Sequence, residues 1–195
     1  MNQFSLRREF LRKILHIVVL VFPLFLLEFG KSICFPYFLV ISILFILFDI
    51  FRIKNSGVKL FYDRYFSIVT KKYEVDKLTS ASYVFLSLII VVLLFDETSA
   101  AAALTIMILS DPIASLVGRV FGNLKLIGNK TLEGSIAFFI SSVIILLLYN
   151  FEAFEVLIVS MGATLIELFS KKIRIDDNFL IPLISAILLF VLQNI

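Results

Sequence analysis

The chain has 195 residues, of which 61% are hydrophobic and only 17% are charged, whereas soluble domains have roughly 45–50% and about 25%. Such a composition excludes a disordered chain, and it excludes a soluble globular domain because a fold of this length cannot bury that much apolar surface. The formal charge of +3 is explained by basic residues beside membrane spans, without a nucleic-acid partner. We therefore expect an all-α, polytopic membrane helix bundle that forms one domain, residues 1–195.

A bilayer core about 30 Å thick requires roughly 17–25 apolar residues per helix. Seven segments meet this requirement, some of them marginally: 14–30, 33–51, 79–95, 98–118, 132–150, 153–170 and 179–195. We therefore expect about seven transmembrane helices.

The only sizeable polar connection covers residues 52–78. Its large apolar residues recur at helical spacing: Leu60, Phe61, Tyr65, Phe66 and Val69. This pattern predicts a cytoplasmic amphipathic helix that lies on the membrane surface, and a plain solvated loop is the alternative.

The basic residues predict the orientation of the spans. With the N-terminus in the cytoplasm, every Lys and Arg except Lys31 falls in a cytoplasmic segment: Arg7, Arg8, Arg12, Lys13, Arg52, Lys54, Lys59, Arg64, Lys71, Lys72, Lys77, Arg119, Lys125, Lys130, Lys171, Lys172 and Arg174. Basic residues concentrate in the cytoplasmic loops of membrane proteins. We therefore expect an integral protein of the cytoplasmic membrane, with its N-terminus inside and its C-terminus outside.

Ionisable residues inside or beside membrane spans are costly and mark candidate functional sites. On this topology they gather toward the cytoplasmic face: His16, Asp49, Asp111, Arg119, Glu133, Glu167, Asp176 and Asp177. Arg12, Lys13 and His16 share one helical face, which makes them candidates for substrate binding or for a structural role. Asp49 and Arg52 are three residues apart, and a structural ion pair is an equally good interpretation of them.

The fourth predicted span contains Asp111 followed by Pro112. The residue before a proline disfavours helical dihedrals, and proline fits the first turn of a helix. We therefore expect the helix to break at Ser110–Asp111 and to restart at Pro112, so that polar backbone lines a cavity. Small residues follow at helical spacing and permit close helix packing: Ser110, Ala114, Gly118 and Gly122. A packing stripe with a capping aspartate is the alternative.

The loop before the fifth span carries Lys125 and Lys130, and Thr131 and Glu133 then open the span. Free backbone N–H groups at a helix start attract anions, so this segment is a candidate phosphate site. Its spacing is not that of a Walker motif, and an ordinary turn with snorkelling lysines is the alternative.

A third group of polar residues surrounds the last cytoplasmic loop. Glu167 and Lys171 lie near the end of the sixth span, and Asp176, Asp177 and Asn178 precede the seventh. Carboxylates beside phosphate-binding cations are what a magnesium–nucleotide site needs, because Mg²⁺ prefers oxygen ligands. The alternative is a polar loop in which Asp177 or Asn178 caps the last helix.

These blocks, in this order, resemble the CTP-dependent polyprenol and lipid kinases: dolichol kinase, phytol kinase and CTP-dependent diacylglycerol kinase. The resemblance rests on Arg12-Lys13, His16, Asp111, Ala114, Gly118-Arg119, Gly122, Lys130-Thr131, Glu133-Gly134, Glu167, Asp176-Asp177-Asn178 and Ile181-Pro182. The middle blocks are also similar to phosphatidate cytidylyltransferase, but Ser170-Lys171-Lys172 matches the C-terminal pattern of that family only in part.

The resemblance implies transfer of the γ-phosphoryl group of CTP to the hydroxyl of a membrane lipid alcohol, of the diacylglycerol or polyprenol and phytol type. The preference for CTP over ATP comes only from this resemblance. Two alternatives stay open, a phosphatidate cytidylyltransferase that makes CDP-diacylglycerol and a small membrane transporter.

We assign roles to these residues on the principle that phosphoryl transfer requires positioning and charge neutralisation. Asp111, with Asp176 or Asp177, is expected to hold Mg²⁺, and Glu133 or Glu167 to orient the hydroxyl or act as general base. The nucleotide-binding candidates are Arg119, Lys125, Lys130, Thr131 and Lys171, and the candidates for a substrate or structural role are Arg12, Lys13, His16 and Asn178.

Overall fold

The computed structural model describes residues 14–66, 76–173 and 175–195, without the side chains of Phe66, Lys171 and Ile173. The predictions that fall on Arg12, Lys13 and residues 67–75 lie outside the described residues, as does the side-chain role predicted for Lys171.

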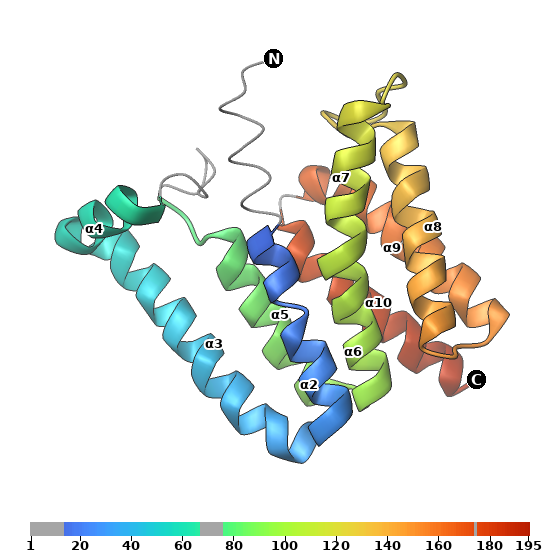
Figure 1. Ribbon diagram of the computed structural model, residues 1–195, viewed down its shortest axis with the longest axis horizontal. Coiled ribbons are helices and arrows are strands. Elements are labelled where there is room, and N and C mark those ends of the chain that lie inside the picture. Colours follow the sequence, from blue (N-terminus) through green and yellow to red (C-terminus); the bar gives the residue numbers. More distant parts are fainter. Residues whose placement is uncertain (1–13, 67–75, 174) are drawn as a thin grey trace.

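Every regular element in these described ranges is a helix, apart from one isolated β-bridge between Lys125 and Thr131. A first apolar helical segment, Ile14–Phe29, ends in α2. The elements are α2 (Val21–Phe29), α3 (Lys31–Lys54), α4 (Ser56–Phe66), α5 (Ser80–Leu94), α6 (Glu97–Thr105), the π-helix η2 (Ile106–Ser110), α7 (Asp111–Val120), α8 (Leu132–Leu148), α9 (Ala153–Ile173) and α10 (Asp177–Gln193). Figure 1 shows them as a helix bundle, with α4 at the upper end of α3, on the left of the view.

All seven predicted apolar segments are helical, but the helices differ in length. Three are long and apolar enough to cross a membrane, namely Lys31–Lys54, Glu97–Val120 and Ala153–Ser170. The shorter apolar helices are Ile14–Phe29, Ser80–Leu94, Leu132–Leu148 and Asp177–Gln193. At 1.5 Å per residue, a helix of 15 to 17 residues spans about 23–26 Å, against a bilayer core of about 30 Å. The number of crossings therefore stays a prediction.

The centre of the bundle is α6, which is followed by η2. The side chains of Ala100, Ala101, Ala102 and Ala103 are completely buried, so α6 is enclosed by its neighbours. Asp96 starts this helix, because its carboxylate accepts a hydrogen bond from the backbone N–H of Ser99 at 2.9 Å. Small side chains let neighbouring helices approach closely, so the alanine run explains why α6 takes the central place.

The outer surface of the bundle is apolar. On α3, large side chains are exposed along its length: Ile33, Tyr37, Val40, Leu44 and Leu47. Exposed apolar surface of this extent is typical of contact with a membrane or a partner rather than with water. Together with the three long apolar helices, this surface indicates an integral membrane protein.

The predicted helix break at Ser110–Asp111 is wrong. Both residues have helical dihedrals, φ −72° and ψ −36° at Ser110 and φ −64° and ψ −46° at Asp111. The chain instead widens into the π-helix Ile106–Ser110 directly before Pro112. A π-turn contains an extra residue, and we attribute it to the proline, whose ring and missing N–H disfavour an ordinary helical turn.

The amphipathic helix predicted within residues 52–78 is present over Ser56–Phe66 as α4. Its residues Leu60, Phe61 and Tyr65 are exposed, with exposed fractions of 55–72%. A solvated loop is therefore wrong for this part of the segment. Its location on a membrane surface stays a prediction.

Candidate functional site

The site is built on the close approach of α7 and α8. A Cβ atom added at Gly134 would lie 2.8 Å from the carbonyl oxygen of Ala114, and one added at Gly118 would lie 2.7 Å from Thr131 Oγ1. Neither position has room for a side chain. The predicted stripe of small residues is therefore a packing contact that holds the start of α8 against α7.

The connection between α7 and α8 is folded back on itself. Backbone hydrogen bonds join Leu126 N–H to the Lys130 carbonyl at 2.9 Å and Leu132 N–H to the Leu124 carbonyl at 2.9 Å. Thr131 then caps α8, because its Oγ1 accepts from the N–H of Gly134 at 3.2 Å. These contacts place the backbone of Lys130 directly before the first turn of α8.

Lys130 extends its ammonium group into a cluster of three carboxylates. Its Nζ forms a short ion pair with Glu167 Oε1 and lies 3.6 Å from Asp177 Oδ2 and 3.8 Å from Asp111 Oδ1. The carboxylates come from α9, α10 and α7, so segments far apart in the sequence meet here. We call Asp111, Glu167 and Asp177 the acidic triad.

The acidic triad surrounds a charged lysine. Burial by itself would lower the pKa of Lys130, but Asp111, Asp177 and Glu167 together raise that pKa above its ordinary value. Lys130 is therefore charged. One ammonium group faces oxygens of three carboxyl groups, so the cluster offers more acidic ligands than a single lysine can pair with.

Glu167 is the most enclosed member of the acidic triad. Its side chain is 3% exposed, and its second oxygen, Oε2, is buried without a hydrogen-bond partner among the described residues. A buried acceptor without a partner is costly. This oxygen is therefore available to a donor or a cation that enters the site.

The last loop divides its two aspartates between different tasks. Asp176 is the N-cap of α10, and its Oδ1 accepts from the N–H of Asn178 at 3.1 Å and from Asn178 Nδ2 at 2.7 Å. Asp177, the next residue, faces Lys130. The alternative in which Asp177 or Asn178 caps the last helix is therefore wrong, because Asp176 is the cap. Of the two aspartates, Asp177 is the one with a described ion pair to Lys130.

The remaining described candidates come from α7, α8, the loop between these two helices and the first described turn. Glu133 does not join the triad, because its Oε1 accepts from the backbone N–H groups of Asn123 at 2.9 Å and Leu124 at 3.3 Å. It therefore braces the loop against α8. Arg119 is exposed in the last turn of α7, Lys125 is exposed in the loop, and His16 is partly exposed in the first described turn.

The chemistry of the acidic triad fits a magnesium ion, because carboxylate oxygens are the protein ligands that Mg²⁺ prefers. Glu167 Oε2, which has no hydrogen-bond partner among the described residues, is a further available acceptor. Within the described ranges, however, no three Asp, Glu, His or Cys side chains are grouped closely enough to form a ready metal site. The carboxylate oxygens are thus of the kind that binds Mg²⁺. In this structure, however, they are spaced around the ammonium group of Lys130.

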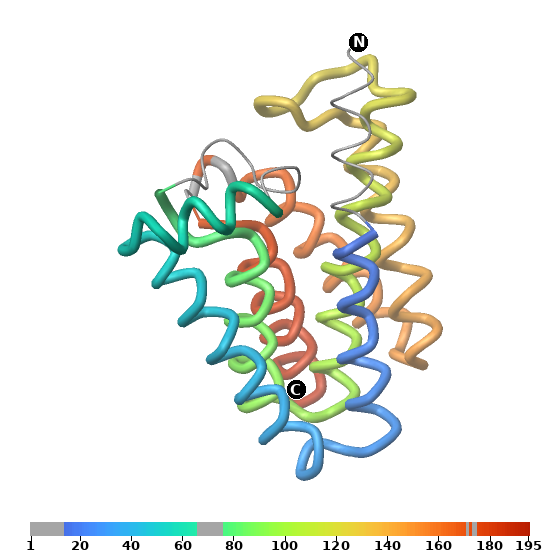
Figure 2. The backbone as a smooth tube through the Cα atoms, turned by 60° about the vertical axis from the view of Figure 1, so that its left-hand side comes forward, coloured from blue at the N-terminus to red at the C-terminus, as the bar shows by residue number. Residues whose placement is uncertain are grey.

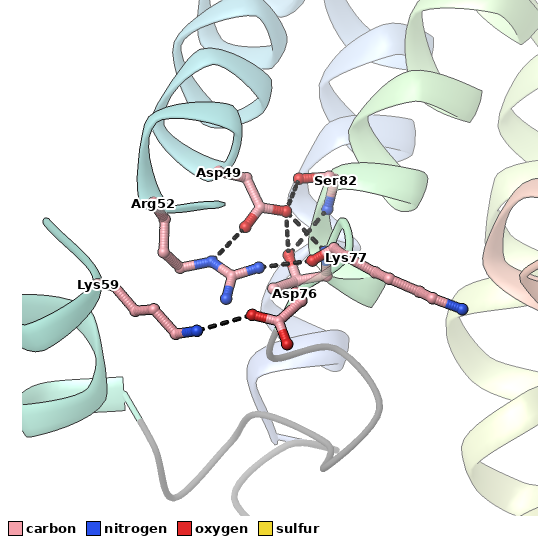
Figure 3. A network of polar contacts seen from close by, with 7 residues as sticks. Asp49, Arg52, Lys59, Asp76, Lys77 and Ser82 are labelled. Carbon is pink, nitrogen blue, oxygen red and sulfur yellow. Dashed lines mark hydrogen bonds and ion pairs between the residues drawn. The ribbon is translucent and has the colours of Figure 1, made fainter. Parts of the chain in front are cut away.

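A second buried polar cluster involves Asp49 and Arg52, whose ion pair measures 2.7 Å from Oδ1 to Nε (Figure 3). Asp49 Oδ2 accepts from Thr79 N at 2.6 Å, Thr79 Oγ1 at 3.0 Å and Ser82 Oγ at 2.6 Å. Arg52 is completely buried and donates from Nη2 to the Lys77 carbonyl at 2.6 Å. Both carboxylate oxygens are engaged, so the structural interpretation of this pair is confirmed.

The spacing of Asp49 and Arg52 indicated their ion pair, but nothing in the sequence pointed to Thr79 and Ser82 as its partners. These residues lie 30 and 33 positions from Asp49. The cluster joins the end of α3 to the start of α5, and Arg52 also lies over the ring of Tyr62 in α4, 4.8 Å from its centroid. It therefore fixes α4 to the bundle.

Comparison with known proteins gives relatives of two kinds. The chain is 34% identical to an uncharacterized protein of Rickettsia prowazekii over 182 residues, which are 88% of each chain. CTP-dependent diacylglycerol kinase 1 of Saccharomyces cerevisiae is 30% identical over 148 residues, 73% of this chain and 51% of the kinase. A probable chloroplastic phytol kinase of Triticum aestivum is 31% identical over 128 residues, 56% of this chain and 43% of that protein.

The aligned part thus spans about half the length of the two named kinases. No family model matches the chain, and no solved structure matches it. The extent of the match to the bacterial protein nevertheless decides the family. The chain belongs to the same protein family as the Rickettsia prowazekii protein, and its distant homologues are lipid kinases.

Proposed function

We propose that this protein is a CTP-dependent kinase that transfers a phosphoryl group to the hydroxyl of a membrane lipid alcohol, of the diacylglycerol or polyprenol and phytol type. The observation that carries the proposal is the convergence of Asp111, Glu167 and Asp177 on Lys130 from separate elements. Phosphoryl transfer depends on such positioning and charge neutralisation. The distant homology to lipid kinases supports the same reaction class.

In this proposal, Asp111 and Asp177 hold Mg²⁺, which would neutralise charge on the phosphates of the nucleotide. Lys130 binds a phosphate oxygen, and the exposed Arg119 and Lys125 bind the outer face of the triphosphate. Thr131 orders the helix start beside Lys130, where free backbone N–H groups favour anions.

Glu167 is the proposed general base, because it is a buried carboxylate with one acceptor oxygen left over. It takes the proton from the lipid hydroxyl as the oxygen of the alcohol forms a bond to the γ-phosphorus. The bond between that phosphorus and the bridging oxygen breaks at the same time, and CDP leaves. Glu133 is a positioning residue in this scheme, since it holds the loop that carries Lys125 and Lys130.

The site is proposed to face the cytoplasm, where CTP is available, in a protein that crosses the inner membrane seven times. Figures 1 and 2 show α4 and the connection between α7 and α8 toward the same end of the bundle. The exposed apolar residues of α4 suit the surface of the membrane at this end. The lipid alcohol would then approach from the bilayer and the nucleotide from water.

The test uses the full chain purified in detergent, mixed with lipid alcohols and with CTP labelled at either the α- or the γ-phosphate. Label from the γ position is expected on diacylglycerol, phytol, farnesol or a longer polyprenol, and ATP in place of CTP tests the nucleotide preference. Asp111→Asn should lower the rate by on the order of 100-fold or more, the effect of removing one group that stabilises transition-state charge. Asp63→Asn, at an exposed position on α4, is the matched control.

Other outcomes would replace the proposal. Transfer of α-label to phosphatidate with release of pyrophosphate would identify a cytidylyltransferase. Cation flux into liposomes without nucleotide would identify a transporter. A folded Asp111→Asn variant with undiminished kinase activity would remove the aspartate from the metal site.

A further inference from the structure

Lys130 occupies the middle of the acidic triad. Its Nζ is paired with Glu167 and lies within 3.8 Å of oxygens from both Asp111 and Asp177. This ion pair is not a solvent-exposed surface contact, because the side chain of Lys130 is 16% exposed and that of Glu167 is 3% exposed. The ammonium group thus stands where three carboxylates from three helices would otherwise repel one another.

We propose that Lys130 is a tethered counter-ion that holds the place of a divalent cation until the nucleotide arrives. The cation would then be held by Asp111 and Asp177, and the ammonium group would move to a phosphate oxygen and leave Glu167 free to act as the base. This inference rests on the proposed function for the identity of the phosphate ligand. It assigns to Lys130 the control of when the metal binds.

Three observations carry this exchange. The triad has acidic oxygens suited to Mg²⁺, yet the described residues contain no ready-made metal site, because the carboxylates are arranged around Lys130. Glu167 pairs with the ammonium group through Oε1, while its Oε2 is buried without a hydrogen-bond partner among the described residues, so the carboxylate is available to the lipid hydroxyl once the ammonium group has left. Lysine is a compact charge on a flexible four-carbon stem, so its head group can leave the carboxylates while its backbone stays before α8.

The exchange predicts that the cation and the nucleotide help each other to bind. A metal ion alone must displace an ammonium group from its ion pairs, which weakens its binding. A triphosphate offers that ammonium group a new partner and so releases the acidic triad. By linkage, the metal must then strengthen nucleotide binding by the same factor as the nucleotide strengthens metal binding.

The test measures binding of Mn²⁺, as a paramagnetic substitute for Mg²⁺, to the full chain in detergent by electron paramagnetic resonance, first without nucleotide. Lys130→Met removes the competing charge and is expected to bind Mn²⁺ at least 10-fold more tightly than the unmodified protein. Lys130→Arg keeps a positively charged side chain at this position and should therefore bind Mn²⁺ weakly. Lys172→Met removes an exposed positive charge near the end of α9 and controls for a general electrostatic effect.

A second measurement adds CTP. It should tighten Mn²⁺ binding to the unmodified protein by 10-fold or more, and it should have a much smaller effect on Lys130→Met. The double variant Lys130→Met with Asp177→Asn should lose the tight binding, which assigns the bound Mn²⁺ to the acidic triad. If Lys130→Met binds Mn²⁺ no more tightly than the unmodified protein, the exchange is wrong.

The removal of Lys130 leaves three carboxylates without a counter-ion, so folding must be followed separately. Thermal unfolding in detergent, with and without Mn²⁺, does this, and Lys130→Gln is a second neutral variant that keeps a hydrogen-bond donor. The exchange predicts that Mn²⁺ raises the melting temperature of both neutral variants more than that of the unmodified protein, and equal rises would overturn it. Because these readouts need no lipid acceptor, failure of the kinase assay and failure of the exchange are distinguishable.

Discussion

Two cations, the buried Arg52 and the partly buried Lys130, show how differently a charge can be accommodated in this bundle. Arg52 pairs with Asp49, and both carboxylate oxygens of Asp49 are engaged by described groups. Lys130 has three carboxylate partners, and one of their oxygens is buried without a hydrogen bond among the described residues. The Asp49–Arg52 cluster, whose carboxylate oxygens are all engaged, is suited to hold helices together. The cluster around Lys130, which keeps an unengaged oxygen, is suited to bind a ligand.

Asp49→Asn is expected to destabilise the protein strongly, because it removes the buried carboxylate charge that pairs with Arg52 Nε at 2.7 Å. Breaking a buried ion pair in this way costs about 3–5 kcal/mol. The melting temperature of the purified protein in detergent measures the loss.

Asp76→Asn is the matched control for this prediction. Asp76 pairs with Lys59 at 2.7 Å, but 79% of its side chain is exposed, so water screens the pair. Its removal should lower the melting temperature much less than Asp49→Asn does. Equal losses for the two variants would show that the Asp49 cluster is not a principal support of the fold.

At the scale of helices, the contact between α7 and α8 decides the position of Lys130. Lys130 lies one residue before the cap of α8, while Asp111 is the first residue of α7. The small residues between the two helices therefore set the distance from the ammonium group to the carboxylate. The π-helix η2 ends at Ser110, directly before Asp111.

Gly134→Ala is expected to separate α7 from α8, because the new Cβ atom would lie 2.8 Å from the backbone oxygen of Ala114. Overpacking of this kind costs about 1–3 kcal/mol. Both the melting temperature and the kinase rate should fall, the latter because Lys130 moves relative to Asp111.

Gly57→Ala serves as the control for an added methyl group on a helix. Its Cβ atom would meet only the side-chain oxygen of Asn55, at 3.2 Å, and alanine is the better helix former by about 0.5–1 kcal/mol. Stability and rate should stay close to those of the unmodified protein. If Gly134→Ala behaves in the same way, the close approach of α7 and α8 does not control the site.

For the whole molecule, the distribution of charge and apolar surface predicts how the bundle sits in a membrane. Apart from Lys31, the basic residues fall in segments that the predicted topology places on one side. Lys31 itself is engaged by the bundle, since its Nζ donates to the carbonyl oxygens of Leu93 at 2.8 Å and Phe95 at 3.0 Å. Lys31 therefore has a structural role at the end of α5, and its position on the other side does not weaken the predicted orientation.

The topology is testable because Cys34 is the single cysteine in the sequence. In a Cys34→Ser background, Glu152→Cys is expected to react with a membrane-impermeant maleimide added to intact cells. Asn123→Cys, in the connection between α7 and α8, should react only after the membrane is opened. Reaction of Asn123→Cys in intact cells would reverse the predicted orientation and place the site outside the cytoplasm.

Much of this protein could be predicted from local sequence. Seven apolar segments become seven helices because hydrophobic length and helix capping are properties of short stretches, as the caps at Asp96, Thr131 and Asp176 show. The candidates for the site also came from the sequence, because ionisable residues are rare in apolar spans and are therefore conspicuous. The sequence determined which side chains were available for chemistry.

The tertiary structure decided how those side chains are used. Ser110–Asp111 stays helical because a π-turn makes room for Pro112, which dipeptide preferences do not predict. Asp176 and Asp177 are neighbours in the chain, yet one caps α10 and the other faces Lys130. The direction in which a side chain points depends on how the helices pack. The carboxylates around Lys130 come from three different helices. Neither feature can therefore be predicted from one short stretch of sequence.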